Sequence, residues 1–519
     1  MENLQTGATI TVSGIVQGVG FRPYIYRKAR LYNLDGAVQN TPSGVEIRVD
    51  GEEKQIQDFF NDLVNSPPVL AEIHQSSIRF HPPVGFEGFV IQRSEEHGQG
   101  FSPVSPDIAT CRECVDEVFD PSDRRYRYPF TNCTNCGPRF TIIQRVPYDR
   151  KNTTMKVFNM CSRCQKEYSS ADDRRYHAQP NACPVCGPEL VLLDSEGVQV
   201  NGEPIQESVR LLKNGRILAI KGLGGYHLAV DPHIPRAVRL LRERKKRPGK
   251  PFAMMARDME VIEKYCEVSA AARKLLCSFQ RPILLLERKT GVHTLAPEVA
   301  PDTRTLGMML PYTPVHHLLL SEGPEVLVMT SANISEEPLV YKDRDAFSTL
   351  KGIADFYLTH NRDIQRPCDD SVLGEVDWRA VPIRRSRGYV PRAIHTGISR
   401  GEVLAAGALE KNTFCVTRDA KAYLSHHIGD LNNEKSVDAY TRGIQDFCSM
   451  FRINPEALAC DMHPDYFSTV HAEKLSRELR IPLFYIQHHH AHIASVLGER
   501  NVQRKVIGIA LDGTGYGPD

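Results

Sequence analysis

The sequence predicts a multidomain α+β protein, and three observations lead to this prediction. A length of 519 residues exceeds what one hydrophobic core usually supports, so several compact units are expected. The residue pattern changes along the chain, from a short series of strands and helices, to a cysteine-rich stretch, to strands that alternate with helices. A content of 41% hydrophobic and 24% charged residues is ordinary for a folded, soluble protein.

The charge balance excludes two classes of partner. Lys and Arg total 64 against 63 for Asp and Glu, so a net charge of +1 creates no field that favours nucleic acid or an anionic membrane. The N-terminal sequence MENLQTGATITVSG lacks the basic and apolar regions of a signal peptide, and no run of about 18 apolar residues occurs. We therefore expect a cytoplasmic protein that binds neither nucleic acid nor membrane.

The first 92 residues predict a small α+β sandwich of ferredoxin-like type. The expected elements are a strand at 8–14, a helix at 21–34, strands at 36–41 and 44–50, a helix at 53–65 and two further strands. The next stretch, 93–107, is polar and contains Gly and Pro, so a linker is expected there.

Eight of the fourteen cysteines form four Cys-x-x-Cys pairs that repeat at an offset of fifty residues, as from Cys111 to Cys161. The phrase DRRYRYPFTNCTNCGP at 123–138 returns as DRRYHAQPNACPVCGP at 173–188. A reducing cytosol argues against disulfides, and four thiolates suit the tetrahedral coordination of Zn²⁺. We therefore predict a double four-cysteine zinc domain. The ligands are Cys111, Cys114, Cys133 and Cys136, then Cys161, Cys164, Cys183 and Cys186.

Two pairings of these ligands stay open. Sequential pairing, with the first four cysteines in one site, is preferred because each repeat would then be self-contained. Interleaved pairing, as in chaperone zinc domains, is the alternative. Closed coordination leaves no position for a substrate, so zinc is expected to stabilise a segment too poor in apolar residues to form its own core.

A glycine-rich turn, GIVQGVGFR at 14–22, joins the first strand to the first helix. Its glycines let backbone NH groups converge at a helix N-terminus, which favours an oxyanion. Arg22 can bind phosphate oxygens through its forked guanidinium, and Asn40 can orient a water molecule. The alternative is a tight turn without a ligand. The predicted phosphate cradle consists of Gln17, Gly18, Val19, Gly20 and Phe21.

The spacing of these residues resembles the motif G-x-V-Q-G-V-x-F-R of the acylphosphatases, with their later asparagine. The resemblance implies that Arg22 binds the phosphoryl group and that Asn40 positions the attacking water. The substrate class that it implies is an acyl or carbamoyl phosphate.

The region from about 202 to 393 predicts an α/β domain, with apolar strands such as GRILAI, KPFAMMA, RPILLLE and EVLVMTS between helices. The best helix is expected at 259–279, with one apolar face. The basic run at 242–250, the residues that follow EVLVM and the arginines at 384–387 together look like a site for a nucleotide triphosphate. Alone, the basic run would read as the solvated end of a helix.

The combination of Lys245, Arg247, Ser331 and Asn333 resembles the YrdC family, which makes carbamoyl-type adenylates from ATP. The resemblance implies that the two cations bind the triphosphate of ATP with Mg, and that Ser331 and Asn333 hold nucleotide or carbamoyl oxygens. The other residues predicted for this cleft are Lys221, Gly224, Gly225, His227, Lys250 and Arg385.

The C-terminal segment contains the sequence IQHHHAH, in which His488 and His492 lie at i and i+4 and can share one helix face toward a metal. Position 489 is His rather than Glu, which excludes the zinc-protease motif. The alternative is a solvated run or an artificial tag. The sequence at 507–517, IGIALDGTGYG, predicts a strand and a glycine turn of the kind that binds phosphate in actin-like ATPases, and 407–413 is interpreted as the first loop of the same lobe.

These pieces resemble the TsaD family, in which a histidine pair binds a metal. The resemblance implies a partial TsaD-like lobe of the actin-like ATPase type. It also implies an iron or zinc ion on His488 and His492, with Asp512 near the metal or the phosphates.

Four blocks in this order resemble the HypF family of carbamoyltransferases over nearly the whole chain. The blocks are 1–92, acylphosphatase-like; 105–190, the zinc domain; 200–393, YrdC-like; and 402–519, an incomplete TsaD-like N-terminal lobe. The resemblance implies a relay that matures nickel–iron hydrogenases. Carbamoyl phosphate is hydrolysed to carbamate, carbamate and ATP form carbamoyl adenylate, and the carbamoyl group passes to the C-terminal cysteine of HypE for cyanide ligand synthesis.

Two other functions stay open. One is a tRNA threonylcarbamoylation enzyme, against which stand the acylphosphatase-like front, the zinc pair and the near-zero net charge. The other is a zinc-based interaction scaffold without chemistry. Because the TsaD-like domain of the family continues beyond the position of Asp519, we expect a fragment or truncated form that makes the adenylate but fails to load HypE.

Overall fold

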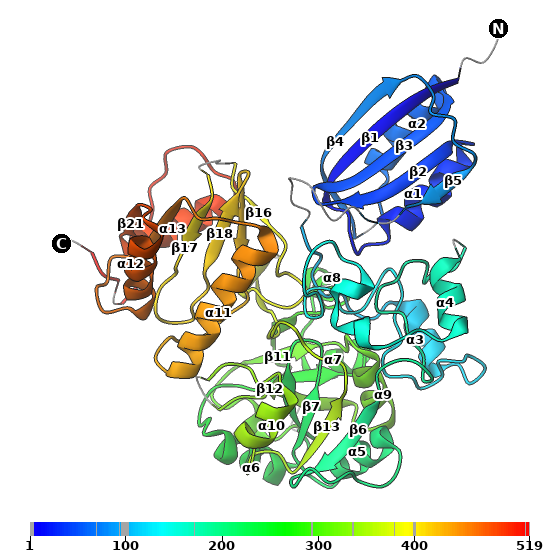
Figure 1. Cartoon of the computed structure of the whole chain (residues 1–519). Helices are drawn as coiled ribbons and strands as arrows, with labels where there is room; N and C mark the ends of the chain where they lie inside the picture. The colour runs from blue at the N-terminus through cyan, green and yellow to red at the C-terminus, as the bar shows by residue number, and fades with distance from the viewer. Residues whose placement is uncertain are drawn as a thin grey trace.

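The computed structural model describes residues 5–517, apart from positions 69, 93, 95–102, 171, 292–293, 335–336, 378, 398–400 and 514. The described chain forms sheets of five, ten and six strands, and a cysteine-rich region between the first two. Figure 1 shows this region, in cyan, between the N-terminal sheet and the ten-stranded sheet. The predicted multidomain α+β architecture is confirmed. The predicted linker at 93–107 lies largely outside the described residues.

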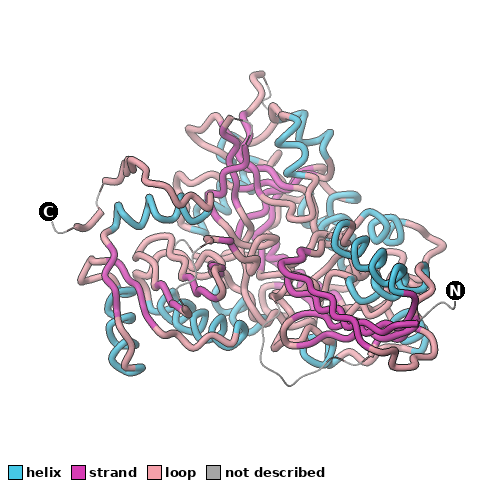
Figure 2. The backbone as a smooth tube through the Cα atoms, turned by 90° about the horizontal axis from the view of Figure 1, so that it is seen from above, coloured by secondary structure: helices cyan, strands magenta, loops and turns pink. Residues whose placement is uncertain are grey.

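The N-terminal sheet has the strand order β4-β1-β3-β2-β5. Its elements are β1 (Gln5–Ile15), α1 (Phe21–Leu31), β2 (Asp35–Thr41), β3 (Gly44–Glu52), α2 (Glu53–Asn65), β4 (Glu72–His81) and β5 (Phe89–Ile91). Alternate residues of β1, such as Ala8, Ile10 and Val12, are buried in the core shared with the helices. The helices lie along one side of the sheet (Figure 2), which is the ferredoxin-like arrangement that the sequence predicts.

The cysteine-rich region contains two short helices at equivalent places in its two repeats, α3 (Arg112–Phe119) and α4 (Ser162–Ser169), and two 3₁₀ turns, η1 (Arg150–Asn152) and η2 (Thr154–Val157). Its apolar side chains join the cores of neighbouring domains. Ile108 packs in the N-terminal core, and Phe140 contacts Phe447 of the C-terminal lobe with ring centroids 6.0 Å apart. The region is therefore stabilised by hydrophobic cores that it shares with neighbouring domains, as well as by its cysteine clusters.

The ten-stranded sheet has the order β15-β14-β10-β11-β9-β12-β8-β7-β13-β6. Its strands are β6 (Leu190–Asp194), β7 (Leu218–Lys221), β8 (Tyr226–Val230), β9 (Ala253–Ala256), β10 (Ile283–Glu287), β11 (Thr305–Met309), β12 (Val326–Ser331), β13 (Phe356–His360), β14 (Val372–Val376) and β15 (Arg379–Arg384). The helical elements around it are α5 (Pro204–Lys213), α6 (Pro235–Lys245), α7 (Met259–Tyr265), α8 (Ala270–Leu276), η3 (Pro297–Val299), α9 (Pro314–Glu322) and α10 (Asp343–Thr349). Neighbours on one strand, such as Leu218 and Ala219, enter cores on opposite faces, so the sheet is buried on both sides.

The single helix predicted at 259–279 is wrong. The structure has two helices, α7 and α8, separated by Cys266, which forms an isolated β-bridge. Ser269 begins the second helix, because its side-chain oxygen accepts a hydrogen bond from the backbone NH three residues later, at 2.9 Å. A capping serine inside an apolar pattern thus marks a new helix that periodicity alone does not reveal.

The C-terminal lobe is a six-stranded sheet of order β16-β19-β18-β17-β20-β21 with three helices. Its elements are β16 (Ile394–His395), β17 (Val403–Ala405), β18 (Cys415–Arg418), β19 (Lys421–Leu424), α11 (Glu434–Phe451), β20 (Ala457–Asp461), α12 (Phe467–Leu479), β21 (Leu483–Ile486) and α13 (His488–Glu499). Strands β17, β20 and β21 run parallel. No helix of the described residues combines the length and apolar character needed to cross a bilayer.

The strand predicted at 507–511 is also wrong, because this segment has no strand pairing among the described residues. Its apolar side chains Ile507, Ile509 and Leu511 are 94%, 76% and 95% exposed. The backbone passes close to α13, since a Cβ atom added at Gly508 would lie 2.6 Å from the side chain of Ile493. An apolar pattern becomes a strand only where a neighbouring edge takes up its backbone hydrogen bonds.

Candidate functional site

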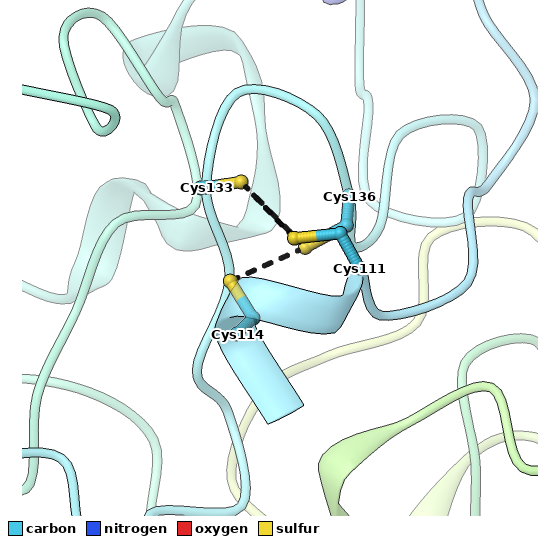
Figure 3. A group of neighbouring side chains, drawn as sticks. All are labelled: Cys111, Cys114, Cys133 and Cys136. Carbon is cyan, nitrogen blue, oxygen red and sulfur yellow. Dashed lines mark hydrogen bonds between the residues drawn. The ribbon is translucent and has the colours of Figure 1, made fainter. Parts of the chain in front are cut away.

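The cysteine-rich region holds two clusters of four cysteines, and Figure 3 shows the first, whose side chains point toward one another. The Sγ atoms of Cys111 and Cys133 lie 3.6 Å apart, and those of Cys114 and Cys136 lie 3.5 Å apart. The two knuckles are held by the start of α3 and by the turn that ends in Gly137, where φ is +96°.

The second cluster has the same geometry. The Sγ atom of Cys183 lies 3.8 Å from that of Cys161 and 3.7 Å from that of Cys186, which in turn lies 3.6 Å from that of Cys164. Four sulfurs bound to one Zn²⁺ at about 2.3 Å would be separated by about 3.8 Å. All eight cysteines are free thiols, so the two clusters fit two structural zinc sites. The structure groups the cysteines sequentially, as preferred from the sequence.

The predicted phosphate cradle lies between β1 and α1. Gly18 and Gly20 both have φ near +73°, a backbone conformation that other residues rarely adopt. Gly20 caps α1 without a side-chain hydrogen bond, and the first turn of the helix has no acidic residue. Val19 and Phe21 are buried and anchor the turn in the core. The NH groups at this helix start are therefore arranged for an anion.

Arg22 and Asn40 are both buried beside the cradle, with 8% and 1% of their surface exposed. The amide nitrogen and oxygen of Asn40 have no hydrogen-bond partner among the described residues, which is unusual for a buried polar group. Gln17 donates to the carbonyl oxygens of Thr41 and Gly44, each at 2.9 Å, and so ties the cradle to the hairpin that carries Asn40. The unpaired amide is free to orient a small ligand.

The cysteine-rich region covers the cradle and leaves a cavity of about 30 Å³. The Nε atom of Arg139 donates to the carbonyl oxygen of Gly18 at 2.7 Å, and a carboxylate oxygen of Asp149 lies 3.5 Å from the guanidinium of Arg22. Burial and the nearby Arg22 lower the pKa of His177 to about 4, so this histidine is neutral at pH 7. The cradle is thus a small, enclosed, positively charged site.

A much larger cavity, of about 1920 Å³, lies between the ten-stranded sheet and the C-terminal lobe. Five of the predicted nucleotide-site residues line it: Arg247, Lys250, Ser331, Asn333 and Arg385. The opposite wall includes Lys411, His426, His427, Asp430 and Lys435 of the C-terminal lobe. Lys435 bridges the two walls, because its Nζ atom lies 2.8 Å from a carboxylate oxygen of Glu337. The cavity therefore belongs to two domains at once.

Lys245 lies directly beneath this cavity and is fully buried. Its Nζ atom donates to the carbonyl oxygens of Ser331 and Asn333, at 2.8 and 2.5 Å, and to Oδ1 of Asn333 at 2.6 Å. Burial, with a smaller contribution from Arg247, lowers the pKa of Lys245 to about 7. Burial and Arg242 likewise lower the pKa of Arg247 to about 10. The site concentrates positive charge, which an anionic ligand would relieve.

The remaining four residues predicted for this cleft lie behind the cavity wall. Lys221 donates to the carbonyl oxygen of His360 at 2.9 Å, and His227 contacts a carboxylate oxygen of Asp370 at 2.9 Å. A Cβ atom at Gly224 would lie 2.1 Å from the carbonyl oxygen of Cys368, and one at Gly225 would lie 2.5 Å from Leu339. Because Asp370 and Leu339 line the cavity, His227 and Gly225 support its wall. Lys221 lines a separate, smaller cavity.

The structure brings the predicted histidine pair of α13 together with Asp512. The Nε2 atoms of His488 and His492 lie 3.1 and 3.5 Å from the same carboxylate oxygen of Asp512. Two imidazoles and a carboxylate suit iron or zinc. The Nδ1 atom of His488 lies 2.6 Å from a carboxylate oxygen of Asp461 at the end of β20. A proton on Nδ1 would leave Nε2, on the side of Asp512, with the lone pair that binds a metal.

Sequence reasoning missed Asp461, and also Asp149, which faces Arg22. An acidic residue at the end of a parallel strand was a usable signal for Asp461, since such ends gather at one edge of a sheet. No comparable signal marks Asp149, which is 127 positions away from Arg22.

Comparisons with known proteins agree with this arrangement of domains. A family model described as acylphosphatase matches residues 8–91, and one described as HypF finger matches 110–143 and 160–193. A model described as telomere recombination, for the Sua5, YciO and YrdC proteins, matches 210–386. A model described as HypF Kae1-like domain matches 399–499.

Relatives match almost the whole chain. Carbamoyltransferase HypF2 of Cupriavidus necator is 45% identical over 98% of this chain and 66% of its own length, and carbamoyltransferase HypF of Rhodobacter capsulatus is 43% identical over 98% and 68%. A crystal structure of full-length HypF in the phosphate- and nucleotide-bound form, 48% identical, covers 99% of this chain and 67% of its own, with a TM-score of 0.95. The chain spans about two thirds of the length of these relatives. Identity of 43–48% over 98–99% of the chain shows that it belongs to the HypF family of carbamoyltransferases.

Proposed function

We propose that this chain acts in carbamoyl transfer during the maturation of nickel–iron hydrogenases. The observation that carries the proposal is the cavity of about 1920 Å³, which holds the predicted nucleotide-binding side chains and opens onto a second domain. Support also comes from relatives named as carbamoyltransferases and from a solved HypF structure described as phosphate- and nucleotide-bound.

In the first step, the N-terminal cradle hydrolyses carbamoyl phosphate to carbamate and phosphate. The NH groups of 17–21 and the guanidinium of Arg22 hold the phosphoryl oxygens and stabilise the charge that develops on them. The unpaired side-chain amide of Asn40 orients the attacking water. Neutral His177 and the buried wall exclude bulk water from the site.

In the second step, the large cavity joins carbamate to ATP and releases pyrophosphate. Arg247 and Lys250 hold the triphosphate, and Ser331 and Asn333 hold nucleotide or carbamoyl oxygens. Lys245 positions Ser331 and Asn333 through their backbone carbonyls. Magnesium bound with ATP neutralises part of the phosphate charge.

Carbamate is short-lived in water, so we expect an enclosed path between the two sites. A small cavity of about 20 Å³ lies between the cysteine-rich region and the ten-stranded sheet, and Lys221, His360 and Arg362 line it. Backbone and basic groups on this route suit a small anion. Trapping free carbamate in bulk solvent at the full rate of turnover would contradict an enclosed path.

In the third step of the relay that the family resemblance implies, the carbamoyl group passes from the adenylate to the C-terminal cysteine thiol of HypE, and AMP leaves. We assign this step to the C-terminal lobe, where His488, His492 and Asp512 would hold an iron or zinc ion. Such an ion would act as a Lewis acid and polarise a carbonyl oxygen.

The decisive experiment measures the conversion of ATP to AMP and pyrophosphate by the purified chain. We expect conversion that requires carbamoyl phosphate and ignores threonine with bicarbonate. Ammonium bicarbonate, which contains carbamate at equilibrium, should restore conversion to the Arg22→Ala variant but not to Ser331→Ala. A requirement for threonine would favour the tRNA threonylcarbamoylation alternative, and no turnover under any condition would favour a scaffold.

A further inference from the structure

The arginines of each duplicated phrase contact the cysteine cluster of the other repeat. We call residues 111–138 the first repeat and 161–188 the second repeat. Arg174, in the second repeat, donates from Nη2 to the Sγ atom of Cys114 at 2.9 Å and from Nη1 to that of Cys111 at 3.8 Å. A contact of this kind places a positive charge directly against a sulfur that would be a metal ligand.

The same contact occurs in the opposite direction. Arg124, in the first repeat, donates from Nη2 to the Sγ atom of Cys164 at 3.2 Å, and Arg125 reaches the same sulfur at 3.8 Å. The two halves of the region are therefore linked by a reciprocal exchange of arginine side chains.

Two glutamates hold these arginines in place. Arg174 donates from Nε to Glu117 on α3 at 3.0 Å, and Arg124 donates from Nε to Glu167 on α4 at 3.1 Å. Each glutamate lies three residues after the second cysteine of its cluster, so every arginine contacts a cysteine and a glutamate of the same short helix. These contacts cross between the repeats in both directions, which a single chance ion pair would not produce.

Charge gives a reason for the exchange. One Zn²⁺ and four thiolates carry a net charge of −2, which is costly beside buried protein unless cations or hydrogen-bond donors face the sulfurs. Loss of a donor that contacts a metal ligand in this way typically lowers the affinity for the metal by about 10- to 100-fold. We propose that each four-cysteine site depends on the arginines of the other repeat, so that the two sites bind and lose zinc as a coupled pair.

The coupling of the two sites is independent of the carbamoyl chemistry and gives a physical reason for the duplication. The ligand sets are self-contained, but the side chains that stabilise their charge are not. Arg124 lies in the loop between the two cysteine pairs of the first site, so loss of metal there loosens the loop that supports the second site. A single copy of the repeat would lack its counter-charge.

The test compares Arg174→Gln and Arg124→Gln in the full 519-residue chain. Zinc is released with a chromophoric chelator, and alkylation of individual cysteines is followed by mass spectrometry. We expect Arg174→Gln to accelerate labelling of the first cluster, and Arg124→Gln that of the second, each by about 10- to 100-fold. Labelling of the variant's own repeat ahead of the opposite cluster, or no acceleration in either variant, would overturn the proposal.

Matched controls are Arg112→Gln and Arg163→Gln, since both arginines are exposed on the same short helices. They should leave labelling unchanged, and an acceleration equal to that of Arg174→Gln would also overturn the proposal. If a glutamine variant fails to fold, Arg174→Lys keeps the charge but loses the forked geometry. It should give a smaller acceleration, with the first cluster still labelled ahead of the second.

Coupling is tested by removing one site. The double variant Cys111→Ser with Cys114→Ser should bind less than one zinc per chain and release the second zinc at least about tenfold faster than the unmodified chain. The exposed Cys277→Ser is the control. One zinc per chain with an unchanged release rate would show that the sites are independent.

Discussion

The cradle and the large cavity both concentrate positive charge, but they are built differently. The cradle consists of one strand–helix turn with backbone NH groups and Arg22, and the cysteine-rich region covers it and leaves about 30 Å³. The cavity has long cationic side chains, a volume of about 1920 Å³ and walls from two domains. The cradle therefore follows from local backbone geometry, whereas the cavity follows from how domains pack. Substitutions in the cradle should therefore reduce the rate of carbamoyl phosphate hydrolysis strongly. Substitutions in the cavity should weaken the affinity for ATP by a smaller factor.

The largest effect is expected at the cradle. Arg22→Ala removes the side chain that holds the phosphoryl oxygens, so the rate of carbamoyl phosphate hydrolysis should fall by roughly 100- to 1000-fold. Phosphate release measures the rate, and ATP binding should not change. Arg27→Ala, an exposed arginine on the same helix, is the matched control. An unchanged hydrolysis rate in Arg22→Ala would place the phosphatase site elsewhere.

A smaller effect is expected at the cavity. Arg247→Ala removes one charge-assisted contact to a polyphosphate, worth about 1.5–3 kcal/mol, so the dissociation constant for ATP should rise by roughly 10- to 150-fold. Calorimetric titration measures this constant, with Arg239→Ala on α6, whose side chain is 54% exposed, as the control. Hydrolysis of carbamoyl phosphate should remain at the rate of the unmodified chain. A lower hydrolysis rate would show that the cavity and the cradle do not function independently.

The pH dependence sharpens the comparison because a lysine with a pKa near neutrality lies beneath the cavity, in contact with Ser331 and Asn333 of its wall. Lys245 has its pKa lowered to about 7 by burial and by Arg247, against an opposing effect of Asp369. A polyphosphate raises that pKa again, so binding takes up a proton. Affinity for ATP should be constant below pH 7 and weaken above it, by at most about tenfold per pH unit. Titrations in buffers of different ionisation enthalpy measure the proton uptake, which Lys245→Met should abolish.

The smallest effect is expected from Asp149 of the cysteine-rich region. Its carboxylate oxygen lies 3.5 Å from the guanidinium of Arg22. A partly exposed ion pair contributes about 0.2–1 kcal/mol, and here the carboxylate competes with the phosphoryl group for Arg22. Asp149→Asn should lower KM for carbamoyl phosphate by roughly two- to fivefold, with kcat little changed. The exposed Asp172→Asn serves as the control. A rise in KM would mean that Asp149 positions Arg22 instead.

The parts that were predictable from sequence are those in which local geometry dictates structure. Positive-φ glycines at 18 and 20 produce the cradle, and Cys-x-x-Cys spacing produces the two clusters. The helix predicted at 259–279 fails because Ser269 caps a second helix, a local signal that the apolar pattern concealed. The strand predicted at 507–511 fails because a strand also needs a partner edge, which no residue pattern supplies.

Contacts between distant segments could not be predicted. Neither the approach of Asp149 to Arg22 nor that of Arg174 to Cys114 has a sequence signature, because a charged residue at the surface and one at an interface look the same in a single sequence. The second wall of the cavity, with His427 and Lys435, is of the same kind. The positions of Lys221 and His227 behind that wall also depend on tertiary packing.

Strand β6, which follows the last cysteine pair directly, decides where the molecule can be divided. It covers the open edge of β13 with five paired residues, from Leu190 to Asp194. A fragment that begins at residue 200 would leave the hydrogen-bonding edge of β13 bare, and such edges promote aggregation. Dissection of this protein into working pieces should therefore keep the end of the second repeat attached to the ten-stranded sheet.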